Sequence, residues 1–169
     1  MRLIGHLIGL YVAPEKGAAM QRLDMATAET GRGLVGDRYH ARTGTFSQRD
    51  PLVPGARALS ILDTRTLAIC RQRLGGDLDA ARLRRNLLLE SDVLHSLRGR
   101  MLLIGEVRVV LTGRCPPCGY LSRLLDADMR RALHGFGGMR ASIVAGGTLH
   151  VDAPVWLAEA PVGRHGLPG

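Results

Sequence analysis

The sequence predicts a mainly β fold of the α+β type, in which short strands form a barrel or sandwich with helical excursions. Turn signals built on glycine and proline recur along the chain at the spacing of about eight to twelve residues that all-β domains show. The apolar runs between them are short, and several alternate with polar residues as half-buried strands do. A regular alternation of strand and helix is missing, which disfavours a doubly wound parallel sheet.

The length of 169 residues is the usual size of one domain, so we expect a single domain over residues 1–169 with a flexible tail over residues 158–169. Aromatic residues make up only 4% of the chain, which disfavours the stacking platforms of single-strand nucleic-acid binding. No apolar run approaches the roughly 18 residues of a membrane span. We therefore expect a soluble, cytoplasmic protein that contacts no membrane.

Arginine supplies almost all of the positive charge. The chain has 23 Lys+Arg against 15 Asp+Glu, a net charge of +8, and Lys16 is its only lysine. The planar fork of arginine matches phosphate and carboxylate groups, so this surplus favours an anionic partner. A GC-rich genome produces the same bias, and nonspecific nucleic-acid binding is the weakest interpretation of the charge.

The positions of helices and strands are predicted from hydrophobic periodicity and from capping and turn residues. Asp63 is a typical N-cap for a helix that ends at Gly75-Gly76, and a second apolar helical stripe is expected over residues 121–132. Strands are expected over residues 3–12, 58–62, 86–89, 140–145 and 148–157, with two more on either side of Gly105.

The segment GRGLVG, residues 31–36, has the glycine spacing of a dinucleotide-binding fingerprint. It does not lie between a strand and a helix, so a tight turn that presents Asp37 and Arg38 is the better interpretation. The polar, glycine-rich stretch that continues to Gly55 is too long for an ordinary connection, and long loops in compact domains are often functional. Asp37 and Arg38 alone could equally form a plain surface ion pair.

Three cysteines, an odd number, favour a reducing compartment and thiol chemistry. Cys115 and Cys118 form a C-x-x-C pair, and Cys118 is expected where a strand passes into a helix. Helix N-terminal amides, together with Arg114 and Arg123, would lower the pKa of this thiol and favour the reactive thiolate. The alternative is two buried cysteines that act as small hydrophobic residues.

Three chemistries are open for this pair. A dithiol redox couple would use both sulfurs, although the pair comes later in the chain than in a thioredoxin domain. A zinc site would need two further ligands, and His134 and His150 are not paired with each other in the sequence. The third is one working thiol beside an incidental neighbour.

A basic run, Arg82, Arg84 and Arg85, leads into Asn86 at the start of an expected strand. Such a run is either a solvated edge or a phosphate clamp that uses the bidentate geometry of arginine.

Several segments together resemble the MOSC domain family, named for the C-terminal domain of molybdenum cofactor sulfurases. They run in family order over about residues 7–155 and read LIGLYVAPEKGAAM, GRGLVGDRYHARTGTFS, ALSILD, ARLRRNLLL, LRGRMLLIGEVRVVLTGRCPPC and GGMRASIVAGGTLHVDAPV. The resemblance implies a MOSC-type β-barrel like the β-barrel domain of pyruvate kinase. Ser91 stands where a glycine is common, and Val151-Asp152 where Gly-Asp is usual.

The resemblance also implies site residues. It makes Cys118 the functional cysteine, both catalytic and a ligand to metal, and leaves the role of Cys115 open. The cofactor-binding residues that it implies are Asp37, Arg38, Arg85, Asn86 and Arg114.

Members of the family are thought to bind the pterin-bound molybdenum cofactor or to carry sulfur as a cysteine persulfide. We therefore expect a molybdenum-dependent oxidoreductase acting on N-hydroxylated compounds, supplied by an electron-donor protein. The alternatives are a persulfide carrier supplied by a cysteine desulfurase and a dithiol redox protein. The chain is too short to include the pyridoxal-phosphate domain of the full-length sulfurases.

Overall fold

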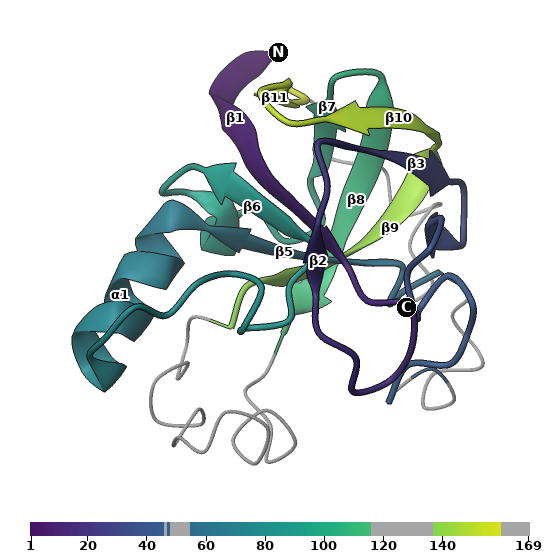
Figure 1. Cartoon of the computed structure of the whole chain (residues 1–169). Helices are drawn as coiled ribbons and strands as arrows, with labels where there is room; N and C mark the ends of the chain where they lie inside the picture. Colours follow the sequence, from purple (N-terminus) through teal and green to yellow (C-terminus); the bar gives the residue numbers. More distant parts are fainter. Residues whose placement is uncertain (46, 48–54, 116–136, 160–169) are drawn as a thin grey trace.

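The computed structural model describes residues 1–45, 47, 55–115 and 137–159, and its centre is a closed barrel of seven strands (Figure 1). Hydrogen-bonded neighbours follow the order β11-β7-β8-β9-β5-β6-β1, and pairing of β1 with β11 closes the ring. The barrel strands are β1 (Arg2–Val12), β5 (Leu59–Asp63), β6 (Leu87–Glu90), β7 (Met101–Ile104), β8 (Val107–Arg114), β9 (Met139–Ala145) and β11 (Pro154–Leu157). The expected mainly β barrel is thereby confirmed.

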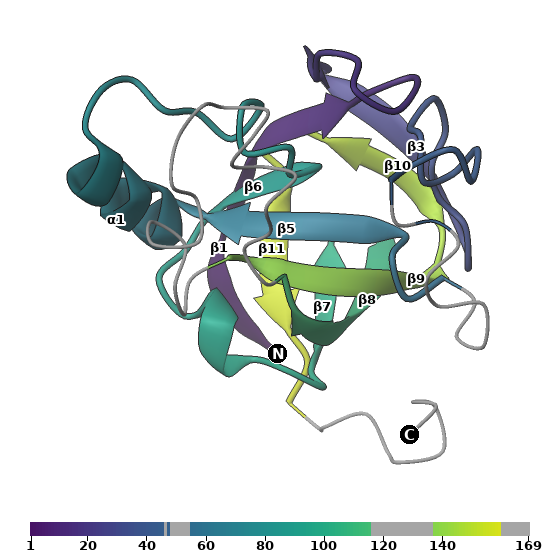
Figure 2. The ribbon, with the colours of Figure 1, turned by 90° about the horizontal axis from the view of Figure 1, so that it is seen from below.

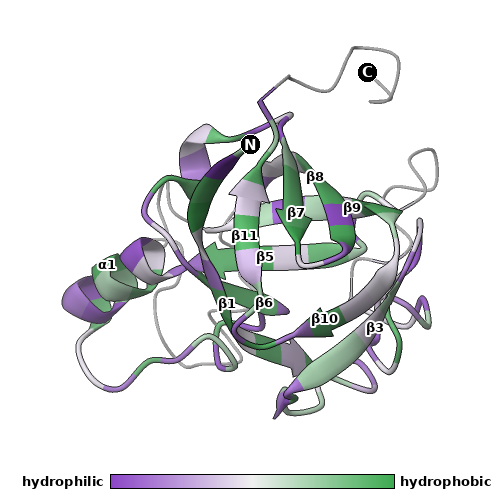
Figure 3. Cartoon of the chain, turned by 90° about the horizontal axis from the view of Figure 1, so that it is seen from above, coloured by the Kyte–Doolittle hydropathy of each residue, from purple (hydrophilic) through white to green (hydrophobic). Residues whose placement is uncertain are grey.

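Alternation of side chains fills the barrel. In β8, Val107, Val109 and Leu111 are fully buried, whereas Arg108 between them is exposed. Residues of this kind from every barrel strand form one apolar cluster inside the ring, and the strands in Figure 3 change accordingly between apolar and polar residues. Because side chains of a strand point alternately to its two faces, residues at the other parity lie on the outside of the wall.

All barrel pairs are antiparallel except β5 with β6, which are parallel and joined by helix α1 (Thr64–Leu74) and the turns after it. The helix begins as expected, since the Asp63 carboxylate accepts a hydrogen bond of 2.8 Å from the Thr66 amide. It ends at Gly75, whose φ of 72° is a left-handed conformation that favours glycine. As Figure 2 shows, α1 lies outside the barrel, and Leu67 and Cys70 pack there in a second apolar cluster.

A three-stranded sheet lies beside the barrel and consists of β10 (Gly147–His150), β3 (Met25–Glu29) and β4 (Gly33–Leu34). Gly31 and Gly36 both have positive φ, at the β3–β4 turn and just before Asp37, so the tight-turn interpretation of GRGLVG is confirmed. The remaining elements are β2 (Gln21–Arg22), which pairs with β1, and the short 3₁₀ helix η1 (Leu94–Ser96).

One expectation is wrong: residues 148–157 are not one strand. The chain turns at residues 151–153, where Asp152 takes a φ of 74°, a conformation that aspartate tolerates better than most residues. The turn sends β10 to pair with β3, whereas β11 pairs with β7 and β1. This segment therefore contributes one strand to each of two different sheets.

Two expectations fall outside the described residues, namely the helix over residues 121–132 and most of the tail over residues 158–169. No helix in the described ranges is long and apolar enough to cross a membrane.

Candidate functional site

Asn86 ties three barrel strands together immediately before β6. Its side-chain oxygen accepts hydrogen bonds of 3.1 Å from both the amide and the hydroxyl of Ser60 in β5. Its side-chain amide donates to the Tyr11 carbonyl in β1 at 3.1 Å, and the Tyr11 amide donates to the Asn86 carbonyl at 2.7 Å. Asn86 is 2% exposed, so these bonds form away from water, where an unpaired amide would be costly.

Asp37 anchors the turn that follows β4. Its carboxylate is buried and accepts hydrogen bonds from the Ala13 amide at 3.0 Å and from the Tyr39 amide at 3.2 Å. The Arg38 amide in turn donates to the Ala13 carbonyl at 2.7 Å. This turn is therefore fixed to the end of β1, two residues beyond the Tyr11 that binds Asn86.

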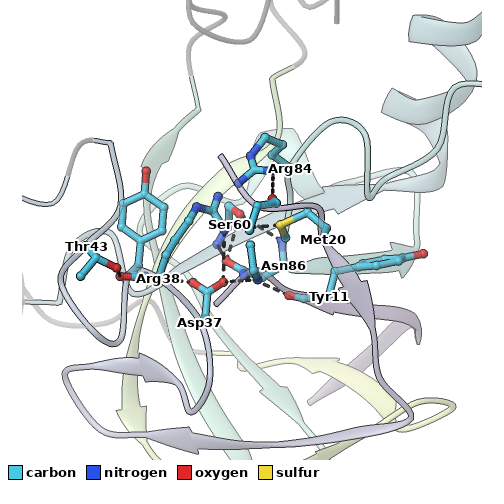
Figure 4. Close-up of polar contacts among 11 residues, drawn as sticks. Tyr11, Met20, Asp37, Arg38, Thr43, Ser60, Arg84 and Asn86 are labelled. Carbon is cyan, nitrogen blue, oxygen red and sulfur yellow. Dashed lines mark hydrogen bonds and ion pairs between the residues drawn. The ribbon is translucent and has the colours of Figure 1, made fainter. Parts of the chain in front are cut away.

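Arg38 is held with its guanidinium against the barrel wall (Figure 4). Nη1 donates to Asp37 Oδ1 at 3.2 Å and to Met20 Sδ at 3.4 Å, and the Arg38 guanidinium carbon lies 4.8 Å from the centre of the Tyr39 ring. The side chain is 7% exposed, so Asp37 and Arg38 form a buried ion pair and not the surface pair that was the alternative. Nη2 and Nε of Arg38 have no acceptor among the described residues.

The basic run at residues 82–85 is divided between the solvent and the interior. Arg82 is exposed, but Arg84 is buried and its Nη1 donates to the Ala18 carbonyl at 2.6 Å. Arg85 is half-buried, and its Nε donates to the Gly137 carbonyl at 3.0 Å. The solvated-edge interpretation thus fits Arg82 alone.

We call the residues Cys115, Gly137 and Gly138 the neck. The Cys115 amide donates to the Gly138 carbonyl at 2.9 Å, which joins the end of β8 to the residue before β9. A Cβ at Gly137 would lie 1.6 Å from the Cys115 carbonyl oxygen, so the backbone contact requires glycine. Cys115 itself is buried, and Cys118 lies outside the described residues.

Arg114 ends β8 opposite Met139 of β9 and is exposed. Its side chain takes part in no hydrogen bond or ion pair with any residue that the structure describes. Asp37, Arg38 and Asn86 are thus all hydrogen-bonded to the end of β1. Arg85 contacts the neck, and Arg114 immediately precedes Cys115 of the neck in the sequence.

Sequence reasoning missed Ser60, Met20 and Arg140. Ser60 lies directly opposite Arg140 in the β5–β9 pair, so both side chains are on the outer face of the wall, and a Cβ at Gly113 would lie 3.6 Å from Arg140 Nη2. Strand parity could have placed Ser60 and Arg140 outside, but only the pairing register brings them together.

Cys70 is a different kind of thiol. It belongs to α1 and is fully buried, and burial raises its pKa from 9.0 to about 11, although Arg73 and Arg85 act in the opposite direction. A thiol with this pKa is almost entirely protonated at neutral pH and is a poor nucleophile.

A shallow depression at the other end of β5 and β6 is separate from these residues. The residues that line it are Thr64, Arg65, Glu90, Ser91 and Asp92. Within the described ranges, no group of three or more His, Cys, Asp or Glu side chains could hold a metal ion.

The fold and the site define a small β-barrel domain in which Arg38 and Arg84 are buried. The chain belongs to the MOSC domain family, because residues 30–156 match the sequence pattern of the MOSC domain. No protein with a curated description matches the chain at a significant level.

Solved structures share the fold. The YuaD protein from Bacillus subtilis superposes with a TM-score of 0.78 at 18% identity, covering 92% of this chain and 96% of its own. YiiM from Escherichia coli gives a TM-score of 0.67 at 18% identity, covering 92% of this chain and 70% of its own. YiiM from Geobacillus stearothermophilus gives 0.65 at 14% identity, covering 96% and 77%.

Proposed function

We propose that this MOSC-domain protein binds the molybdenum cofactor, uses the Cys118 sulfur as a ligand to the metal, and reduces N-hydroxylated compounds. The observation that carries the proposal is the Asp37–Arg38 turn, which hydrogen bonds fix to the barrel with two arginine donors unused among the described residues. When bound, the cofactor supplies the two-electron redox chemistry, and the protein supplies binding and orientation.

The donor set fits a phosphate-bearing group. Arg38 has Nη2 and Nε without acceptors in the described part of the chain, and Arg85 has both Nη groups without acceptors there. Arg114 is exposed and has no acidic partner among those residues. We assign these three arginines to the phosphate group of the molybdenum cofactor, since charge-assisted bonds from a guanidinium are among the stronger hydrogen bonds.

Asp37 and Asn86 contribute to the same site by holding Arg38 and Arg85 in place. Asp37 orients Arg38, and Asn86 fixes the start of β6 beside Arg85. A preorganised donor loses less free energy on binding than a mobile one, which is why buried hydrogen bonds behind the arginines support the proposal.

Cys118 follows Cys115 by three residues, and three residues of chain span at most about 11 Å. A thiol so close in sequence to the neck is within reach of the residues that contact the neck. Cys118 is also a better candidate for the metal ligand than Cys70. The pKa of Cys70 is about 11, which makes Cys70 unsuited to bind metal as a thiolate at neutral pH.

The test is the molybdenum and pterin content of protein purified from a host that makes the cofactor. We expect Cys118→Ser to lower bound molybdenum by about tenfold or more, since a lost metal ligand or its support commonly costs at least that factor. Arg114→Gln should lower the content severalfold. The matched control is Arg108→Gln, an exposed arginine at the other end of β8. Full molybdenum content in Cys118→Ser would overturn the proposal.

The same preparation distinguishes a persulfide carrier, which would use the same thiol. After incubation with a cysteine desulfurase and its substrate, a carrier gains one sulfur atom on Cys118, visible by mass spectrometry of the peptide. Sulfur on Cys118 in a protein that never binds molybdenum would replace the proposed function with sulfur transfer.

A further inference from the structure

We propose that Met20 is a site of reversible oxidation, and that its sulfoxide fastens the loop over residues 14–20 to the buried guanidinium of Arg38. We call this loop the strap. The oxidant is a hydroperoxide such as hydrogen peroxide. The inference goes beyond cofactor binding and does not depend on it, because it concerns only the contact between the Met20 sulfur and Arg38.

The strap connects β1 to β2 and is anchored near both ends. Before its start, the Ala13 amide donates to the Asp37 carboxylate at 3.0 Å, and the Ala13 carbonyl accepts from the Arg38 amide at 2.7 Å. Near its end, the Ala18 carbonyl accepts from Arg84 Nη1 at 2.6 Å. The four residues at the start of the strap are exposed. An exposed segment of this kind opens more easily than the barrel to which it is attached.

Met20 adds the last anchor through its sulfur. Nη1 of Arg38 carries two hydrogens, and its acceptors are Asp37 Oδ1 at 3.2 Å and Met20 Sδ at 3.4 Å (Figure 4). The Arg38 side chain is only 7% exposed, so solvent has little access to this contact. A thioether is a weak acceptor, which makes this bond weaker than one to an oxygen. Among the methionines in the described ranges, Met20 is the one whose sulfur accepts a hydrogen bond.

Met20 lies at the surface of the molecule, where an oxidant in solution can reach it. It is half-buried, and its neighbours in sequence, Ala19 and Gln21, are exposed. Met139, in contrast, is fully buried inside the barrel, and Met25 is 55% exposed. We therefore expect peroxide to oxidise Met20 and Met25 and to spare Met139.

Oxidation converts the thioether into a stronger acceptor. The sulfur attacks one oxygen of hydrogen peroxide, the O–O bond breaks, and the products are the sulfoxide and water; the sulfur loses two electrons and the peroxide gains them. The new oxygen is bonded to the sulfur that already contacts Arg38, and an oxygen acceptor binds a charged donor more strongly than a thioether does. The sulfoxide therefore fastens the end of the strap to the Asp37–Arg38 turn.

Methionine sulfoxide reductases reverse the reaction. Two thiols become a disulfide, and the oxygen leaves as water. Because each reductase acts on one epimer of the sulfoxide, complete reversal requires both.

The single lysine of the chain, Lys16, provides the test. It lies in the exposed part of the strap, so endoproteinase Lys-C can cut the chain only after this residue. Cleavage of the folded protein tracks the fraction of molecules in which the strap is open. We expect peroxide-treated protein to be cut about fivefold more slowly than untreated protein, since hydrogen bonds to charged groups are the stronger ones. Peptide mass spectrometry should find one added oxygen on Met20, and the two reductases should restore the original rate.

Three variants separate this oxidation from others. Met20→Gln imitates the oxidised state, because its side-chain amide places an oxygen where the sulfoxide has one, so it should be cut slowly without oxidant. Met20→Leu has no acceptor, so peroxide should leave its cleavage rate unchanged although other methionines are still oxidised. Met25→Leu is the matched control, which removes an exposed methionine outside the strap and should respond to peroxide as the wild type does.

An unchanged or faster cut after oxidation of Met20 in the wild type would overturn the inference. Complete oxidation of Met25 in folded protein that leaves Met20 untouched would do the same. In Arg38→Gln the sulfoxide lacks its charged partner, so slowing by peroxide that persists in this variant would also contradict the inference. If Arg38→Gln does not fold, Met20→Gln decides the matter, since a wild-type cleavage rate there is incompatible with the proposed bond.

No measurement in this series involves molybdenum. Failure of the protein to bind the cofactor would leave the inference standing, and failure of the inference would leave cofactor binding untouched.

Discussion

The two ends of the parallel pair β5 and β6 differ in their charged residues. At the amino ends lie Ser60 and Asn86, with Arg84 and Arg85 just before Asn86. At the carboxyl ends, α1 begins after Asp63, and Glu90 and Asp92 line the depression there. In open α/β sheets, ligands bind outside the carboxyl ends of parallel strands, where helix N-termini favour anions.

From this comparison we expect that a single strand-helix-strand unit in this barrel does not follow that rule. The Asp63 carboxylate already occupies the Thr66 amide at the start of α1, and the neighbouring acids add negative charge. Arg65 also lines that depression, but the buried Arg84 and the half-buried Arg85 are at the amino ends, so an anion is expected there. Variants of Asn86 and Asp63 test this contrast, and variants of Cys70 and Glu29 test buried and exposed groups elsewhere; the four predictions run from the largest effect to the smallest.

Asn86→Ala should destabilise the protein by about 3–4 kcal/mol, because it leaves the Ser60 amide and the Tyr11 carbonyl buried without partners, at about 1–3 kcal/mol each. Urea unfolding measures the loss. Ser91→Ala at the opposite end is the control and should cost less than about 1 kcal/mol, since it removes only a weak 3.4 Å bond from the Val93 amide. Equal losses in the two variants would abolish the contrast between the ends.

Cys70 should make the protein less stable in alkali. Its folded-state pKa of about 11 lies above the ordinary 9.0, so the stabilisation is complete below pH 9.0 and is lost as the pH rises toward about 11. The loss is up to about 2–3 kcal/mol over this interval. Unfolding of Cys70→Ala should lack that part of the pH dependence, and identical slopes for variant and wild type would show that the thiol is not shielded.

Asp63→Ala should lower stability by about 1–2 kcal/mol, as expected for a lost helix N-cap. Asp63→Asn keeps an acceptor for the Thr66 amide and should lose less. The pair of variants, compared by thermal unfolding, separates the hydrogen bond from the charge. Because both variants lack the charge, equal losses would mean that the charge, and not the capping hydrogen bond, stabilises this end.

Glu29 should give the smallest effect. Its hydrogen bond to His40 at 2.9 Å lowers the carboxyl pKa below 4.5, and Arg32 acts in the same direction. The contribution is therefore present above pH 4.5 and disappears as the pH falls below that value. As the pH falls, the wild type should lose slightly more stability than Glu29→Gln, which is measured as the difference between their urea unfolding midpoints. A difference that does not change with pH would argue against the Glu29–His40 hydrogen bond in solution.

Local signals predicted the parts of the fold that depend on neighbours in sequence. Asp63 as cap and Gly75 as terminator of α1 needed only capping rules, and the alternation in Val107–Leu111 needed only strand periodicity. The division of residues 148–157 into two strands was not predicted, because nothing in the local sequence pattern requires the left-handed turn at Asp152. That turn is favoured by two sheets whose strands come from distant parts of the chain.

The candidate site shows the same limit. The sequence and the family resemblance indicated Arg38, Arg85 and Asn86, but not what each contacts. Asn86 meets Tyr11, 75 residues away, only because the barrel closes, and Arg85 meets Gly137, 52 residues away, for the same reason. Placement of Ser60 opposite Arg140 likewise depends on register, which periodicity alone does not specify.

Closure of the ring has a consequence for synthesis on the ribosome. Arg2 lies opposite Leu157 in the β1–β11 pair, so β1, the first of the barrel strands in chain order, lacks its β11 neighbour until the last barrel strand has been translated. Its unpaired edge is open to other chains during that interval, a common route to aggregation. We therefore expect yield to depend on chaperones that shield nascent chains more than on the stability of the finished protein.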